Sequence, residues 1–197
     1  LILQQAGDHD PKYRAIEQIL LAGVAGTGPW LPQGCIVFTQ YFDSAWWVTQ
    51  RLSDRLPDET VALYAGGAAS GLFRAGAFTR IDRDTIKAQV RAAELKLVIG
   101  TDAASEGLNL QKLGTLINLD LPWNPTRREQ RKGRIQRIGQ VRDEVLIYNM
   151  RYRGSVEDRV HELLSERQES IYGLFGQLPD TLEERRKTGE LGKDAKE

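Results

Sequence analysis

The sequence lacks several features that would mark particular classes of protein. Cys35 is the only cysteine among 197 residues, so no internal disulfide can form and the chain suits a reducing compartment. No apolar run approaches the roughly 20 residues of a membrane span. Residues 1–5 do not have the basic and apolar regions of a signal peptide. We therefore expect a cytoplasmic protein in a bacterium or a nuclear one in a eukaryote, neither secreted nor in contact with a membrane.

Net charge is absent as well, because 27 basic residues balance 27 acidic ones. The overall charge gives no sign of a nucleic-acid partner, and such a claim must rest on a local patch. The two histidines, His9 and His161, have no further ligands at metal-binding spacing, so surface positions are favoured and no metal site is predicted. A hydrophobic fraction of 41% is ordinary for a globular protein with one core.

Short apolar runs alternate with amphipathic segments along the chain. This alternation predicts an α/β fold with three layers and a central parallel sheet. The expected strands are residues 35–38, 61–64, 95–99, 116–119 and 145–150. Helices are expected from Asp10-Pro11 to about residue 21, from a cap at Asp43 or Ser44 to about 56, over 80–94, from Pro125, and from residue 155. The glycine- and alanine-rich residues 66–77 are predicted to form a mobile loop.

One domain is expected over residues 10–153, with a helix over residues 154–176 packed on it. Residues 1–9 have the character of a linker from an upstream domain, so the sequence resembles the middle of a longer polypeptide. Residues 177–197 are charged and nearly free of large apolar groups, which predicts a disordered tail. We expect the isolated chain to be monomeric.

A cluster of basic residues dominates the second half of the chain. Six of them fall within eleven positions, opposed only by Glu129: Arg127, Arg128, Arg131, Lys132, Arg134 and Arg137. Gln130, Arg134 and Arg137 follow the spacing i, i+4, i+7, which predicts that they share one face of a helix. Two planar, permanently charged guanidiniums on one face suit a polyphosphate, and Gly133, between Gln130 and Arg134, leaves room for a close partner. A solvated basic face paired with acids elsewhere is an equally good interpretation of the cluster alone.

A second unusual segment, residues 100–110, directly follows an expected buried strand. Its small residues, its hydroxyl and its glycine are suited to binding phosphate through backbone amides, and Asn109 is suited to a ribose. Asp102 or Ser105 would serve equally well as the cap of an ordinary turn. Trp46 and Trp47 present a similar choice between core packing and base stacking, and core packing is favoured for at least one of them.

Taken together, these segments resemble motifs of superfamily 2 helicases. Thr101-Asp102-Ala-Ala-Ser-Glu-Gly107-Leu-Asn109 resembles motif V, and the run from Gln130 to Gln140 resembles motif VI. The ending Arg-Ile-Gly-Gln, with Asp-Leu-Pro-Trp-Asn-Pro upstream, is similar to the Swi/Snf branch, especially its bacterial RNA-polymerase-associated members. The segment 36–41 resembles motif IV, and 63–67 resembles the next short block.

The resemblance implies that this chain is the second of two RecA-like domains that enclose ATP and Mg²⁺. The first domain would hold most of the ATP and Mg²⁺ contacts, and it is the expected partner of this chain. Arg134 and Arg137 would be arginine fingers, and Gln130 would sit near the γ-phosphate. Glu106, Gly107 and Asn109 would line the nucleotide. The expected nucleic acid is double-stranded DNA, with RNA as an alternative. The resemblance implies that six residues face it: Thr39, Gln40, Gly66, Gly67, Thr101 and Trp123. Trp123 would suit the interface between the domains equally well.

The sequence lacks two motifs of a complete motor. No segment matches the P-loop pattern Gly-x-x-x-x-Gly-Lys-Ser/Thr, and no acidic Asp-Glu-x-His box is present, so the chain alone should not hydrolyse ATP. We therefore interpret the chain as one of the two motor domains of an ATP-dependent translocase or helicase. A binding module that keeps the fold without the motor is the alternative. A nicotinamide oxidoreductase is disfavoured, because no Gly-x-Gly-x-x-Gly follows the first strand.

Overall fold

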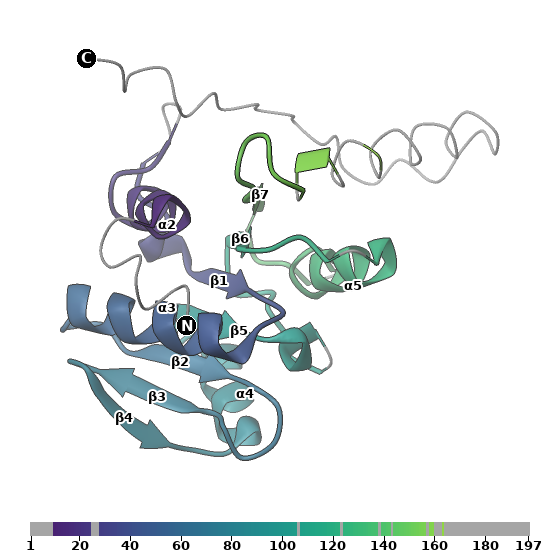
Figure 1. Ribbon diagram of the computed structural model, residues 1–197. Coiled ribbons are helices and arrows are strands. Elements are labelled where there is room, and N and C mark those ends of the chain that lie inside the picture. The colour runs from purple at the N-terminus through teal and green to yellow at the C-terminus, as the bar shows by residue number, and fades with distance from the viewer. Residues whose placement is uncertain are drawn as a thin grey trace.

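A seven-stranded sheet with helices on both faces forms the core of the computed structural model (Figure 1). The structure describes residues 10–24, 28–105, 107–122, 124–137, 139–142, 144–156, 158, 159 and 163. The strands are β1 Cys35–Phe38, β2 Val61–Tyr64, β3 Gly71–Arg74, β4 Ala77–Arg80, β5 Leu97–Gly100, β6 Thr115–Asn118 and β7 Leu146–Asn149. The helices are α2 Pro11–Leu21, α3 Phe42–Arg55, α4 Arg83–Arg91 and α5 Pro125–Ile135, with the short 3₁₀ turns η2 Leu31–Gln33 and η3 Asp102–Ser105.

The sheet is parallel except at one edge. Its strand order is β4-β3-β2-β5-β1-β6-β7, with parallel pairing from β2 to β7. β1, β2, β5 and β6 are buried along their whole length, as expected of strands covered on both faces. The predicted α/β fold with a central parallel sheet is confirmed.

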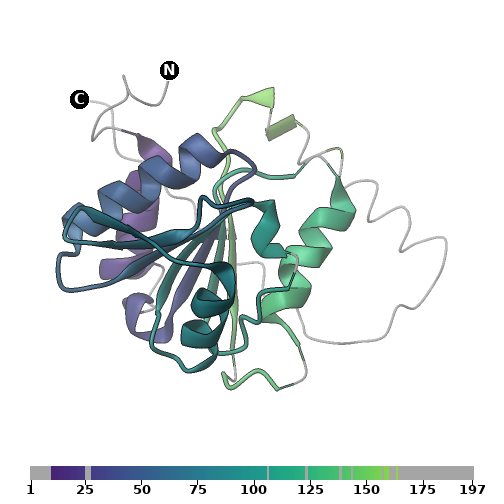
Figure 2. The same cartoon turned by 90° about the horizontal axis from the view of Figure 1, so that it is seen from below.

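Alternate residues of each strand feed two separate cores. On one face Val37, Leu63 and Ile99 pack against α2 and α3. On the other face Ile36 and Tyr64 pack against side chains of α4 and α5, among others. Figure 2 shows the sheet between these two helical layers. Cys35 lies in the first core, where burial raises the pKa of its thiol, so that it is inert packing.

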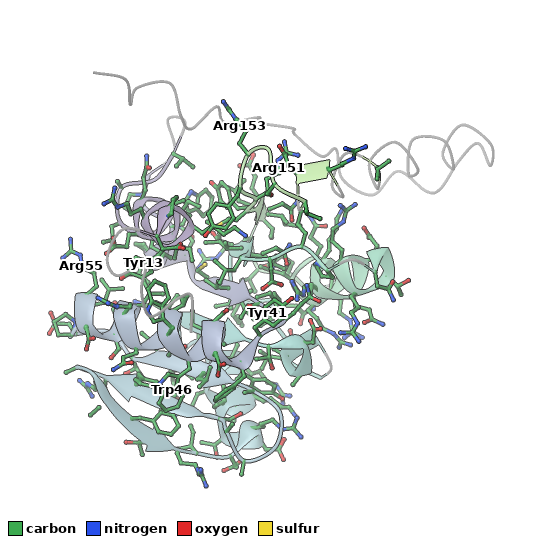
Figure 3. All side chains as sticks on the ribbon, viewed as in Figure 1. Tyr13, Tyr41, Trp46, Arg55, Arg151 and Arg153 are labelled. Carbon is green, nitrogen blue, oxygen red and sulfur yellow. The ribbon has the colours of Figure 1, made fainter. Side chains whose placement is uncertain are left out.

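The predicted mobile loop at 66–77 is wrong in its second half. Gly71–Arg74 and Ala77–Arg80 pair as an antiparallel hairpin that extends the sheet. Ala75 and Gly76 make its turn with φ angles of 47° and 77°, the left-handed geometry that suits the twist of a two-residue hairpin. The hairpin is held by aromatic packing, because the Trp46 ring lies 4.9 Å from Phe73 and 4.8 Å from Phe78 (Figure 3).

Helix boundaries agree with expectation where a cap is present. Asp10 accepts a hydrogen bond from the backbone N–H of Tyr13 at 2.8 Å and begins α2, as predicted. The predicted caps of α3 are wrong, because that helix begins after Tyr41 without a side-chain cap. α4 is shorter than the predicted 80–94, since Asp82 caps it and the preceding residues belong to the hairpin.

Core packing is confirmed for the tryptophans, since Trp46 and Trp47 are both half-buried against the first core and Trp47 meets Tyr13 edge-on at 5.4 Å. None of the helices in the described ranges is long and apolar enough to span a membrane. The predicted linker 1–9, the tail 177–197 and most of the predicted helix 154–176 lie outside the described residues.

Candidate functional site

Four loops meet at the carboxyl edge of the parallel strands, where α/β sheets gather their ligands. The backbone N–H of Thr39 donates to Gly100 at 3.0 Å, and that of Thr101 donates to Tyr64 at 3.0 Å. The backbone N–H of Leu119 donates to Phe38 at 2.9 Å. The loops after β1, β2, β5 and β6 therefore lie side by side.

Asp120 holds the loop after β1. Its carboxylate accepts a short hydrogen bond from the Thr39 hydroxyl and two from the backbone N–H of Gln40, at 3.0 and 3.1 Å. The Gln40 side chain donates to the carbonyl of Leu121 at 3.3 Å. Thr39 is fully buried, so its hydroxyl does not face solvent as the implied nucleic-acid contact requires. Thr39 shapes the loop instead.

A fully buried arginine connects this loop to α5. The Arg131 guanidinium donates to the Asn118 side chain at 2.9 Å, to the Asp120 carbonyl at 3.2 Å and to the Asp102 carboxylate at 2.7 Å. It also lies 5.1 Å from the centre of the Phe38 ring. Arg131 thus ties α5 to the ends of β1, β5 and β6.

Asp102 is shared by two arginines of α5. One carboxylate oxygen accepts from Arg131, and the other forms a short ion pair with Arg127, whose side chain is about half exposed. The sequence placed Arg131 in the basic cluster, and the alternative of basic residues paired with acids elsewhere holds for Arg127 and Arg131. A signal was present, because Arg131 stands four positions before Ile135, the only apolar residue of α5 besides its first proline, and both are buried.

A more exposed side of α5 carries the polar side chains expected at a polyphosphate. Gln130 is exposed and Arg134 is half-buried. Gly133 is exposed, and a Cβ added there would meet nothing within 4 Å. The expected single helical face is wrong for Arg137, because α5 ends at Ile135 and Gln136 leaves the helical conformation. The exposed Arg137 lies in the turn that follows.

That turn is fastened to the loop after β5. The Gln140 side chain donates to the carbonyls of Ile135 at 2.8 Å and Leu113 at 3.2 Å. The backbone N–H of Leu110 donates to the Arg134 carbonyl at 3.3 Å. The motif V-like and motif VI-like segments are therefore neighbours.

The remaining predicted residues are spread along this edge. The Asn109 amide is turned toward its own loop, where it donates to Gln111 at 2.7 Å. Thr101 is almost fully buried, whereas Gly66, Gly67 and Gly107 are exposed. Glu106 and Trp123 lie outside the described residues. Within the described part of the chain, no three His, Cys, Asp or Glu side chains are placed to hold a metal ion.

Residues 31–139, more than half of the chain, match the family described as the helicase conserved C-terminal domain. The chain belongs to this family. It is 44% identical to the uncharacterized ATP-dependent helicase YqhH of Bacillus subtilis over 120 residues, 61% of this chain and 21% of YqhH. It is 38% identical to the RNA polymerase-associated protein RapA of Sodalis glossinidius over 79 residues, 39% of this chain and 8% of RapA.

A solved structure agrees on the fold. The C-terminal part of the Fun30 ATPase domain superposes with a TM-score of 0.56 at 19% identity, covering 77% of this chain and 42% of that one. The resemblance to Swi/Snf-type superfamily 2 proteins and the RecA-like fold are thereby confirmed. The chain spans about a fifth of YqhH and less than a tenth of RapA, so the helicase C-terminal domain is one part of those longer proteins.

Proposed function

We propose that this helicase C-terminal domain is the second motor domain of an ATP-dependent DNA translocase or helicase. In this role it closes on a first RecA-like domain that holds ATP and Mg²⁺. The observation that carries the proposal is the division of α5 into two faces. Arg131 anchors the inner face, while Gln130 and Arg134 stand on the outer one. An anchored helix presents charged groups in a fixed position, which is what stabilisation of a transition state requires.

Arg134 and Arg137 act as arginine fingers in this proposal. The bound nucleotide supplies the γ-phosphoryl group whose transfer to water releases energy. The two guanidiniums donate to its oxygens and neutralise the charge that develops on them, an effect worth about 10³–10⁵ in rate. Gln130 reports that the γ-phosphate is present. Arg137 comes from the turn after α5, so the two fingers approach from different backbone directions.

The nucleotide and the nucleic acid contact different loops. Glu106 and Gly107 line the nucleotide. Asn109 contacts the nucleotide too, once its amide gives up its hydrogen bond to Gln111. Gln40, Gly66, Gly67 and Trp123 form the track for the nucleic-acid backbone, where amides and hydroxyls hold phosphates without reading sequence. Thr101 joins them because it is 9% exposed, whereas Thr39 is 0% exposed. The sequence contains no P-loop lysine, so the chain alone, a monomer in this proposal, does not turn over ATP.

Arg134→Ala in the full-length protein tests the proposal. DNA-stimulated ATP turnover should fall about 10³-fold or more, while binding of a fluorescent ATP analogue stays within a few-fold, because the first domain holds the nucleotide. Arg153→Ala removes an exposed arginine away from α5 (Figure 3) and should leave turnover unchanged. Unchanged turnover in Arg134→Ala would contradict the finger role.

A further inference from the structure

A buried lysine joins α2 to the segments that follow β6 and β7, outside the residues assigned so far. Lys12 lies in the first turn of α2 and is 8% exposed, and its ammonium donates to the Leu119 carbonyl at 2.8 Å. The same ammonium lies 4.5 Å from the centre of the Tyr152 ring. The Tyr152 hydroxyl donates to the Asp10 carboxylate at 2.8 Å, although the two residues are 142 positions apart.

This position is an unfavourable one for a cation. Burial takes the ammonium out of water, which costs free energy unless its partners replace the lost hydration. The N-terminal end of a helix also carries partial positive charge, which opposes a lysine in the first turn of α2. A methionine would fill the same space without either cost. The lysine at position 12 is therefore explained by what its bond to the Leu119 carbonyl holds in place.

The carbonyl that Lys12 binds lies just beyond the regular sheet. The pairing of β6 with β1 and with β7 ends at Asn118, one residue earlier. The Leu119 N–H still donates to the Phe38 carbonyl at 2.9 Å. A buried main-chain carbonyl past the end of a strand needs a donor from elsewhere, and Lys12 provides one.

The residue after Leu119 connects the two sides of the proposed site. The Asp120 carboxylate accepts from the Gln40 N–H at 3.0 and 3.1 Å, which holds the loop after β1. The Asp120 carbonyl accepts from the Arg131 guanidinium at 3.2 Å, which holds the inner face of α5. A shift of the Leu119 carbonyl would therefore displace the loop after β1 and α5 together.

We propose that Lys12 is a positioning residue for ATP turnover. It fixes the Leu119 carbonyl, and the bonds of the following residue then keep α5 and its fingers in place. Tyr152 keeps the ammonium on this carbonyl, because its ring covers the charge. The inference rests on the proposed function, since it concerns the placement of the same fingers. It gives a role to α2, which contains no residue assigned to the site so far.

Amide hydrogen exchange of the 197-residue chain, followed by NMR, tests the path through Asp120 without any nucleotide. In Lys12→Met the Gln40 amide should exchange about tenfold faster, because its bond to Asp120 loosens locally. The Val37 amide within β1 should keep its rate. Lys96→Met is the matched control, since it removes an exposed lysine next to the amino end of β5 by the same substitution. It should leave both rates unchanged.

DNA-stimulated ATP turnover of the full-length protein tests the consequence for the fingers. Lys12→Met should lower kcat about tenfold, while the KM for ATP stays within about twofold because the first domain holds the nucleotide. Tyr152→Ala should reproduce this loss, and Tyr152→Phe should recover most of it, since the ring remains. Val90→Ala truncates a buried side chain of α4 in the other core, so it should lower the melting temperature and leave kcat unchanged.

Several outcomes overturn the positioning role. An unchanged kcat or an unchanged Gln40 rate in Lys12→Met overturns it, and the finger role stands if Arg134→Ala still loses turnover. An equal loss of kcat in Val90→Ala assigns the effect to stability and overturns the role too. An unchanged kcat in Arg134→Ala contradicts the proposed function, and positioning by Lys12 falls with it.

Discussion

The two faces of α5 put the same type of residue to opposite uses. On the inner face Arg131 is fully buried and bonded to Asn118, Asp102 and the Asp120 carbonyl. On the outer face Gln130 and Arg134 retain access to solvent. The guanidinium of Arg131 exchanges water for three fixed acceptors and a ring, whereas Gln130 is exposed and Arg134 is half-buried.

The difference shows that a count of basic residues does not predict a binding surface. Arg127 and Arg131 share Asp102, and the Asp120 carboxylate lies 3.9 Å from Arg131, so much of their charge is balanced within the domain. Lys12 is a further internal cation, buried with its ammonium donating to the Leu119 carbonyl at 2.8 Å. Position relative to the core decides which charges can meet a ligand.

Arg131→Met should have the largest effect on stability. The substitution removes the hydrogen-bond donor of Asn118 and of the Asp120 carbonyl, and it leaves Asp102 paired with Arg127 alone. We therefore expect a loss of about 3–5 kcal/mol in the free energy of unfolding. Urea unfolding followed by circular dichroism measures this loss. Arg131→Lys should lose less than Arg131→Met, because it keeps the charge but cannot reach all three acceptors.

Arg137→Ala is the control for that comparison. Arg137 is exposed and lies beyond the end of α5, so its removal should change the free energy of unfolding by no more than about 0.5 kcal/mol. If Arg131→Met proved as mild as Arg137→Ala, the inner face would not be the anchor that holds the fingers.

The sheet was predictable because its signal is local. Residues such as Val37, Leu63 and Ile117 fall in continuous apolar runs, and such runs specify strands buried on both faces. The hairpin was not predicted because Gly71, Gly76 and the nearby alanines give this segment the composition of a loop. Its stability comes from Phe73 and Phe78 packing on Trp46, a contact between segments distant in the sequence.

The geometry of the candidate site was only partly predictable. The motif resemblance implied a shared nucleotide site for residues 106–109 and α5, and the bond from the Leu110 N–H to the Arg134 carbonyl shows that the two segments are neighbours. Helical spacing could not foresee that α5 would end before Arg137. It also could not reveal the internal bond of Thr39 to Asp120, since that pair is 81 positions apart.

Gly133→Ala tests the outer face of α5. We expect it to raise the free energy of unfolding, by less than Arg131→Met lowers it. Gly133 lies within α5 without a left-handed φ and without any neighbour that a methyl group would meet. The domain itself therefore gives no reason for glycine, and alanine should stabilise the chain by about 0.5–1 kcal/mol. In the full-length protein the methyl group should lower ATP turnover, because the first domain closes on this face. A more stable variant with normal turnover would show that the face stays open.

Arg127→Gln should have the smallest effect, and salt should separate it from Arg131→Met. Both arginines pair with Asp102, but the Arg127 side chain is 53% exposed and that of Arg131 is 0% exposed. An exposed pair contributes about 0.2–1 kcal/mol, which counterions screen. Urea unfolding at about 0.05 M and about 1 M sodium chloride should show the loss from Arg127→Gln shrinking toward zero at the higher salt. The loss from Arg131→Met should persist, because counterions do not reach a buried guanidinium. Equal salt dependence in the two variants would mean that water reaches Arg131 and that the two faces of α5 are less distinct than their burial indicates.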